Sequence, residues 1–416
     1  EEIGALAQAF EYGIIPGKPQ TVTGSFSSNA ITVTCTHNGK SISFKCSIQY
    51  PGTGKAPYPA MIGVGMNTLN TSEILKLGVA LITLPCDEIG QQTDGSSRGK
   101  GKFFDLYGSN YDAGAIAAWV WGASRLIDAI EITPSANIDA KRLAVTGGSR
   151  LGKGALAVGA FDDRIALTIP QECGCGGVGS WRVADWMGSS VQTLSEINWE
   201  NCWFSNSLNQ FRGQTNKLPI DQHEVMGMCA PRALLVIENT SMIWLGNKST
   251  YTCSQSAHMI YEALGIPDRM GFSQVGHPTH LEFVAAQQPE VTAYIQKFLV
   301  GGGTGNTNVN KTDGGFTLDK AKWIDWTVPT LTGTLPGPGN NNPTPTPTDP
   351  KIVYGDVNED GKVNSNDCSI MKRYLLEMIT TFQSDNAKKA ADVNKDGKIN
   401  STDYSAMKRI VLEITT

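Results

Sequence analysis

A serine that follows an apolar stretch is the first residue whose setting suggests chemistry. Ser149 lies in the segment LAVTGGSRLGKGALAV, residues 143–158, which predicts a strand, a Gly-Gly turn and a helix. Such a turn exposes the serine hydroxyl, and the helix N-terminus behind it favours developing negative charge. The segment departs from the GxSxG form of a nucleophile elbow, because Leu151 replaces the second glycine and Gly152 follows one place later. Glycine-rich turns also bind phosphate or simply reverse the chain, so the segment alone leaves these alternatives open.

A nucleophilic serine needs a general base, and the chain has five histidines. His37 lies beside a predicted hairpin turn, and His258 lies inside a predicted helix, where packing is its expected role. His277 and His280 lie in the loop GHPTH, after the last predicted strand. A hydrolase with the chain order Ser, acid, His places its base there, but position alone does not separate the two histidines.

The third member of such a triad is a carboxylate that orients the imidazole and stabilises its charged form. Glu172 follows the predicted strand 165–170, and Glu238 follows the predicted strand 233–237. Both therefore lie at the carboxyl ends of strands, where open α/β sheets carry their sites. The residues by themselves do not decide between the two carboxylates.

The C-terminal part carries a different chemistry, in two copies of one loop. DVNEDGKVNSND begins at Asp356 and DVNKDGKINSTD begins at Asp392, a spacing of 36 residues. Oxygen-bearing side chains at loop positions 1, 3, 5, 9 and 12, with glycine at position 6, are the pattern that wraps ligands around Ca²⁺. We therefore expect two structural calcium ions, and none is needed for serine hydrolysis. The expected ligands, with the two lysines contributing carbonyl oxygens, are Asp356, Asn358, Asp360, Lys362, Asn364, Asp367, Asp392, Asn394, Asp396, Lys398, Asn400 and Asp403.

The chain divides at a segment that cannot bury a core. Residues 333–350, GTLPGPGNNNPTPTPTDP, predict an extended linker between a body, residues 1–332, and a tail, residues 351–416. In the body, the stretch 21–49 predicts antiparallel strands with an Asn-Gly turn, after which strands alternate with helices. This alternation predicts an α/β fold with a mostly parallel sheet covered on both faces. The predicted strands are 60–64, 79–84, 143–146, 165–170 and 233–237, and the predicted helices are 113–131, 256–264, 368–376 and 404–412.

Composition excludes several classes of partner. The net charge is −5 and no run is rich in Lys or Arg, so nucleic acid is not an expected partner. No apolar run approaches the roughly 20 residues that cross a bilayer, so a membrane is not expected either. The chain begins at Glu1 without Met, so an export signal is not expected to be visible. The nine cysteines show no paired metal spacing, and Cys173 and Cys175 do not predict a zinc site.

Several blocks of the body, in order, resemble the glucuronoyl esterase family, carbohydrate esterase family fifteen. They are GGSRLGKGALAVGAFDDRIALTIPQECG, IWLG, MGFSQVGHPTH and WIDWTVPTL, and together they extend over nearly all of the body. The resemblance implies an α/β-hydrolase fold and cleavage of esters between 4-O-methyl-glucuronic acid of glucuronoxylan and lignin alcohols. An acetyl-xylan or feruloyl esterase with the same triad is the alternative enzyme, and a non-catalytic carbohydrate-binding component is the alternative of another class.

The resemblance also assigns roles by motif. It implies that Ser149 is the nucleophile, Glu172 the acid, His280 the base and Arg150 the donor that stabilises the oxyanion, which leaves Glu238 as a rival or auxiliary carboxylate and His277 as a neighbour. Implied contacts to the sugar come from Lys153, Gln192, Glu200 and Trp244. Many fungal members of the family bridge a Cys before the nucleophile to a Cys after the histidine. Gly148 and Leu281 stand at those positions here, so rigidity of the histidine loop is in question.

The tail resembles a type I dockerin, because each DxNxDGxxNxxD loop leads into a predicted helix with a Lys-Arg pair. The resemblance implies a small α-helical domain with two calcium loops that binds a cohesin module of a cellulosome scaffold. It also implies that the protein is secreted and that its body acts on glucuronoxylan outside the cell. The positions that match the family's recognition residues are Ser365, Asn366, Lys372, Arg373, Ser401, Thr402, Lys408 and Arg409.

Overall fold

A ten-stranded sheet forms the centre of the body in the computed structural model, which describes residues 2–197, 202–331, 353–376 and 378–411. The strand order is β1-β2-β3-β5-β4-β6-β7-β8-β9-β10. Strands β1 to β3 form an antiparallel meander, β5 pairs antiparallel with β3, and all later pairs are parallel. The strands are β1 Thr21–Ser27, β2 Ala30–His37, β3 Lys40–Gln49, β4 Tyr58–Val64, β5 Ala80–Leu84, β6 Ile138–Gly148, β7 Ile165–Gln171, β8 Ala233–Glu238, β9 Met270–Gln274 and β10 Asn310–Thr312.

The predicted α/β architecture is confirmed, including the antiparallel lead-in and the five predicted strands. Two strands were not predicted. β9 reads MGFSQ, and β10 has three residues, NKT. Neither carries an apolar run long enough to stand out, because β9 mixes glycine and polar residues and β10 is a short edge strand.

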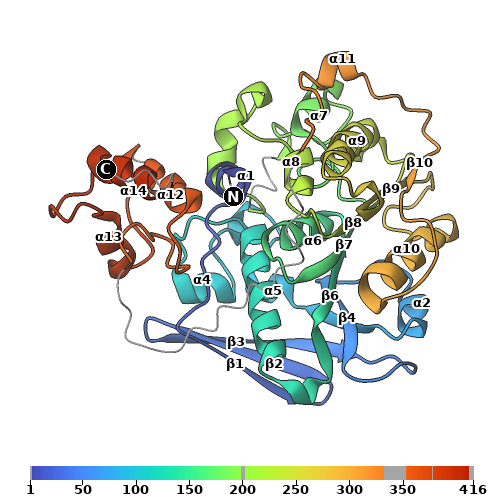
Figure 1. Cartoon of the computed structure of the whole chain (residues 1–416), viewed down its shortest axis with the longest axis horizontal. Helices are drawn as coiled ribbons and strands as arrows, with labels where there is room; N and C mark the ends of the chain where they lie inside the picture. The colour runs from blue at the N-terminus through green and yellow to red at the C-terminus, as the bar shows by residue number, and fades with distance from the viewer. Residues whose placement is uncertain (1, 198–201, 332–352, 377, 412–416) are drawn as a thin grey trace.

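Helices cover both faces of the sheet, as Figure 1 shows. Neighbouring side chains of a strand point to opposite faces, so Ile62 belongs to the core beneath α5 and α6 while Met61 packs with the core beneath α2 and α10. Both residues are fully buried, as a central parallel strand requires. The helices of the body are α1 Glu2–Ala7, η1 Gln8–Tyr12, α2 Thr71–Lys76, α3 Cys86–Ile89, α4 Lys102–Tyr107, α5 Ala115–Glu131, α6 Arg150–Phe161, α7 Trp181–Met187, α8 Gln222–Gly227, α9 Asn247–Ala263, α10 Gln288–Ile295, η10 Gln296–Val300 and α11 Lys320–Trp323.

The predicted helix 256–264 begins much too late. Helix α9 starts at Asn247, and its first half, NKSTYTCSQ, contains almost no apolar residues. Ser249, Thr250 and Ser254 are nevertheless buried; the hydroxyls of Ser249 and Thr250 donate to the carbonyls of Ser180 and Asn247. The buried face of this half of the helix thus carries hydroxyl groups, so it lacks the three- and four-residue spacing of apolar residues that predicts a helix.

In its described residues the tail forms three helices beside the body: α12 Ser365–Leu375, α13 Asp385–Ala391 and α14 Ser401–Val411. The predicted starts of the first and last at residues 368 and 404 were three residues too late, because each helix begins inside its loop. The Asn364 side chain caps α12 there. Helix α13 was not predicted. In Figure 1 the tail lies against α1 and α4, while the predicted linker, residues 333–350, falls outside the described residues.

No helix within the described ranges is both long and apolar enough to span a bilayer. All nine cysteines are free thiols, and eight of them are buried.

Candidate active site

Ser149 occupies a sharp turn between β6 and α6. Its backbone has φ 57° and ψ −129°, a conformation that side chains rarely adopt, and its N–H donates to the Gln171 carbonyl at 2.9 Å. Gly147 is required by close packing, since a Cβ there would lie 2.5 Å from the Leu151 carbonyl oxygen. A Cβ on Gly152 would lie 2.9 Å from the Gln171 carbonyl oxygen. The late glycine at position 152 therefore takes the role of the second glycine in GxSxG, and the turn has the geometry of a nucleophile elbow.

The predicted acid and base are in contact. Nδ1 of His280 lies 2.8 Å from Oε2 of Glu172, and the backbone N–H of Leu281 donates to the same oxygen at 3.0 Å. Nε2 of His277 lies 3.2 Å from Oε1 of Glu172. Glu172 is 1% exposed and follows β7 directly, which is the strand beside β6 and its serine. One buried carboxylate therefore orients His280 and also meets His277.

The residues next to Ser149 and His280 in the chain contact each other. Leu281 packs against Gly148, because a Cβ on Gly148 would lie 2.6 Å from Cδ2 of Leu281. Nε2 of His280, on the ring edge away from Glu172, is buried and has no hydrogen-bond partner among the described residues. Gly148 and Leu281, the two positions where the resemblance implied a bridge in other family members, thus meet here through packing. The loop is held by this contact and by the Leu281 N–H bond rather than by a disulfide.

Glu238 belongs to the support of the site and is not within hydrogen-bond reach of either histidine. Its Oε1 accepts the backbone N–H groups of Cys173, at 2.9 Å, and Gly174, at 3.4 Å. Burial, followed by the nearby Glu172, raises the pKa of Glu238 to about 8. Glu238 therefore stays protonated at neutral pH and adds no second negative charge beside Glu172. The geometry favours Glu172 over Glu238 as the partner of the histidine.

Arg150 and Lys153 both project from the first turns of α6, but they lie in different surroundings. The Arg150 guanidinium is half-exposed and stacks on Trp203, with Cζ 4.5 Å from the ring centroid. Lys153 is 2% exposed, and its Nζ donates to the Cys173 carbonyl at 2.8 Å and to Oε1 of Gln192 at 3.3 Å. Arg150 is thus positioned beside the nucleophile by an aromatic face, while Lys153 ties the loop after Glu172 to Gln192.

An exposed indole stands beside His280. The Trp244 ring lies edge-on to the imidazole with centroids 5.1 Å apart, and the side chain is 46% exposed. Its carbonyl accepts the backbone N–H of Gln192 at 2.7 Å, so two predicted sugar contacts are adjacent. Plain core packing is excluded for Trp244 by its exposure. Glu200, the remaining predicted sugar contact, lies outside the described residues.

Two further residues of the site escaped sequence reasoning. Trp203, under Arg150, sits in a stretch without a recognisable motif. Asn239 fixes His277, with Nδ2 lying 3.1 Å from Nδ1 of that ring and Oδ1 accepting the His277 N–H at 3.2 Å. Its place directly after β8, at the same sheet edge as Glu172, was a usable signal.

The two loops of the tail fold alike. Gly361 and Gly397 turn with φ 84° and 82°, and their N–H groups donate to the Asp356 and Asp392 carboxylates at 2.9 and 2.8 Å. Burial raises the pKa of Asp356 to about 6 and of Asp367 to about 7, with Asp360 adding to both shifts. Such clustered buried carboxylates fit a hard cation. Within the described ranges no group of three His, Cys, Asp or Glu side chains is arranged to hold a metal ion by itself.

The predicted recognition residues of the two repeats differ in exposure. Ser401, Thr402, Lys408 and Arg409 are exposed on α14. In the first repeat Lys372 is exposed, whereas Ser365 and Asn366 are half-buried and Arg373 is 3% exposed. The body therefore covers Arg373 in the free chain, and the role of the eight positions in recognition stays a prediction.

Comparisons with known proteins identify the family of each part of the chain. A family model described as "Glucuronyl esterase, fungi" matches residues 33–265, and one described as "Dockerin type I domain" matches residues 354–412. The 4-O-methyl-glucuronoyl methylesterase of Hypocrea jecorina is 48% identical over 334 residues, which cover 80% of this chain and 71% of the relative. That of Podospora anserina is 47% identical over 79% of this chain and 69% of the relative.

Solved structures give the same family. The glucuronoyl esterase catalytic domain from Hypocrea jecorina superposes with a TM-score of 0.76 at 47% identity, over 80% of this chain and 90% of that one. A Ser-to-Ala mutant of the Sporotrichum thermophile enzyme, in complex with methyl 4-O-methyl-beta-D-glucopyranuronate, gives 0.75 at 42% identity, over 80% and 89%. The chain has the α/β-hydrolase fold of these esterases, it belongs to the glucuronoyl esterase family, and it carries a type I dockerin domain.

Proposed function

We propose that this chain is a serine esterase that hydrolyses esters of 4-O-methyl-glucuronic acid, of the kind that join glucuronoxylan to lignin alcohols. The observation that carries the proposal is the buried Glu172 in contact with His280, at the sheet edge where Ser149 occupies a strained turn. The methylesterase names of its relatives supply the class of ester.

The reaction follows from the positions of these groups. Oγ of Ser149 attacks the uronoyl carbonyl carbon, and Nε2 of His280 takes the serine proton. Oε2 of Glu172 accepts a hydrogen bond from Nδ1–H of His280 and stabilises the imidazolium. His280 then gives its proton to the leaving alcohol, which leaves an acyl-enzyme. Water then attacks the acyl carbon while His280 takes its proton; the bond from that carbon to Oγ of Ser149 breaks, and His280 returns the proton to Oγ as glucuronate leaves.

Arg150 supplies the charge for the oxyanion. Arg150 follows the nucleophile directly in the chain. Its guanidinium stacks on the Trp203 ring and is not paired with a carboxylate in the described part of the chain. A preorganised cation at a forming oxyanion contributes several kcal/mol to transition-state stabilisation. Backbone N–H groups at the start of α6 complete the donor set.

Four residues hold the sugar, and two of them, Trp244 and Gln192, lie beside His280. The exposed indole of Trp244 covers a pyranose face, and Gln192 beside it, with Lys153 and Glu200, holds hydroxyl groups. The uronoyl carbonyl must reach Ser149 while the pyranose ring contacts Trp244. The site therefore recognises the acid part of the ester more strictly than the alcohol part.

The tail attaches the enzyme to a scaffold. A type I dockerin binds a cohesin module, so residues 351–416 place the body, residues 1–332, on a cellulosome through the linker 333–350, outside the cell. Each loop binds one calcium ion, which supplies folding energy to the tail; Asp356, Asp360 and Asp367 with their Asn partners hold the first, and the equivalent residues of the second repeat hold the other.

Hydrolysis of benzyl glucuronate by the wild-type chain and by Ser149→Ala tests the proposal. The variant should lose turnover by about 10⁴-fold or more, while cohesin binding in calcium remains unchanged. Rates on acetylated xylan and feruloyl esters, measured in parallel, should be far lower than on the glucuronate ester. Retained hydrolysis in the variant refutes the triad, and faster hydrolysis of acetyl or feruloyl esters refutes the substrate class.

A further inference from the structure

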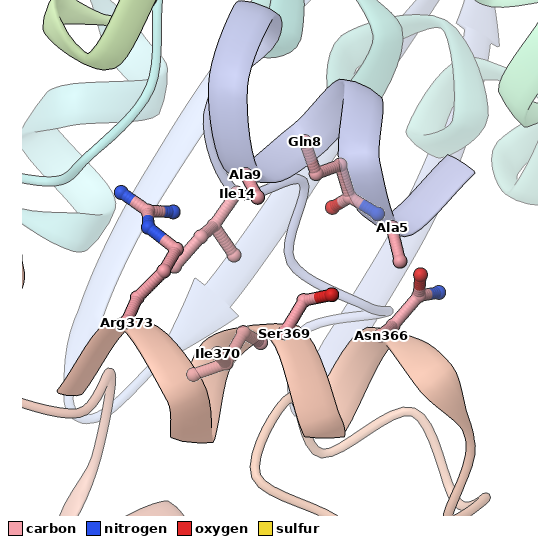
Figure 2. Close-up of a pocket in the computed structure, with 8 residues that line it drawn as sticks. All are labelled: Ala5, Gln8, Ala9, Ile14, Asn366, Ser369, Ile370 and Arg373. Carbon is pink, nitrogen blue, oxygen red and sulfur yellow. The ribbon is translucent and has the colours of Figure 1, made fainter. Parts of the chain in front are cut away.

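The first helix of the tail packs on the N-terminal segment of the body. Figure 2 shows Ala5, Gln8, Ala9 and Ile14 of the body facing the side of α12 that carries Asn366, Ser369, Ile370 and Arg373. Ile14 is 9% exposed and belongs to the core of the tail, together with Val357, Ile370, Met371, Ala390, Ala391 and Met407. Ile14 of the esterase body, with the partly buried Tyr111 packed against the same cluster, thus completes the core of the dockerin.

Polar contacts fix the same interface. The Arg373 guanidinium forms an ion pair with the Asp112 carboxylate and approaches Oγ of Ser207 at 3.4 Å. The Tyr111 hydroxyl lies 3.2 Å from Oε1 of Gln383. Burial lowers the pKa of Arg373 to about 10, which still leaves the side chain charged at neutral pH. A buried cation of this kind needs its carboxylate, so the covered Arg373 is paired with Asp112 of the body.

The packing between the domains is otherwise loose. A cavity of about 410 Å³ remains between α1, α12 and α14. Its lining includes Leu6, Phe10, Cys368, Tyr404 and Lys408. The interface therefore depends on the Arg373 ion pair and on Ile14 more than on continuous apolar contact.

The second repeat presents the equivalent surface without a cover. A shift of 36 residues relates Ser365, Asn366 and Arg373 to Ser401, Thr402 and Arg409. The first three face or adjoin the body, and the last three are exposed within the part of the chain that the structure describes. The two faces carry nearly the same side chains, but the body covers the α12 face and leaves the α14 face exposed.

We propose that the esterase body occupies the α12 face of its own dockerin, so that the complete chain binds cohesin through the α14 face alone. The inference rests on the proposed function, because it takes cohesin as the partner. An Arg373 that pairs with Asp112 cannot at the same time pair with an acidic group of a partner. Arg409 is exposed and keeps that ability, as do Ser401 and Thr402 at the start of the same helix. The body thereby fixes one orientation of the enzyme on its scaffold.

Two charge reversals at equivalent positions test this in the complete chain. Affinity for purified type I cohesin modules is measured by calorimetry with calcium for wild type, Arg409→Glu and Arg373→Glu, and hydrolysis of benzyl glucuronate confirms that each body is folded. We expect Arg409→Glu to weaken binding by about thirty-fold or more, as loss of a central interface arginine does. Arg373→Glu should stay within about threefold of wild type. Equal losses, or a larger loss in Arg373→Glu, overturn the inference.

Hydrogen exchange supplies an independent measurement. In wild type, cohesin should slow exchange in α14 and leave residues 2–14 and α12 as slow as before. Faster exchange in residues 2–14 when cohesin binds would mean that the partner displaces the body, which contradicts the inference. Failure of the wild-type chain to bind any type I cohesin is a separate result, since it overturns the proposed scaffold attachment itself.

Discussion

Replacing Glu172 by Gln separates the two carboxylates of the site. Gln keeps the volume of the side chain but carries no charge, so it cannot stabilise the imidazolium that forms when His280 takes the serine proton. The amide can also present an N–H to Nδ1 of His280, which forces the wrong tautomer across the present 2.8 Å contact. Loss of such an orienting carboxylate costs about 10³- to 10⁴-fold in kcat, or roughly 4 to 5.5 kcal/mol of activation free energy.

Glu238→Gln is the matched control. Burial and Glu172 keep Glu238 protonated up to about pH 8, so a neutral amide reproduces its charge, and its carbonyl can still accept the Cys173 and Gly174 N–H groups. At pH 7 we expect kcat of this variant within about fivefold of wild type, by initial rates on benzyl glucuronate. KM should change little in both variants. A loss in Glu238→Gln as large as in Glu172→Gln would refute the assignment of the acid.

Three further results follow from the structure. Trp244→Ala should raise KM for methyl 4-O-methyl-glucuronate by about five- to tenfold with little change in kcat, because the indole contacts the sugar and not the reacting atoms; a fall in kcat alone would contradict this. Chelation of calcium should abolish cohesin binding and melt the helices of the tail in circular dichroism while hydrolysis persists, and equal loss of hydrolysis would show that the body needs the ion. The pKa of Glu238 rises from 4.5 to about 8 on folding, so its contribution to stability is complete below about pH 4.5 and is lost as pH rises through 8. Glu238→Gln should therefore show a smaller fall in Tm between pH 5 and pH 8 than wild type.

Most of the fold could be predicted from apolar runs, and most of the site from the residues that follow the predicted strands. Strands β6, β7 and β8 are buried around residues 145, 168 and 236, and their carboxyl ends hold Ser149, Glu172 and Glu238 as a parallel sheet requires. The residues alone left the choice between the two carboxylates open, and the family resemblance favoured Glu172. In the structure Glu172 contacts His280, whereas Glu238 accepts backbone N–H groups.

Other features leave little trace in a single sequence. The first half of α9 is buried but polar, so its sequence does not predict a helix. The hydroxyls of Ser249 and Thr250 donate hydrogen bonds to backbone carbonyls there. The covering of Arg373 depends on Asp112, which is more than 250 residues away in the chain and belongs to no motif. Contacts between domains of this kind are decided by surface shape, which local patterns do not encode.

Covalent labelling tests the central claim about Ser149 most directly. The complete chain is treated with a fluorophosphonate at pH 7, digested and mapped by mass spectrometry, with Glu238→Gln and His280→Ala treated in the same way. A single adduct on Ser149 that forms at a similar rate in Glu238→Gln and nearly disappears in His280→Ala is the expected result. An adduct on another residue, or labelling of Ser149 that does not depend on His280, would contradict the account.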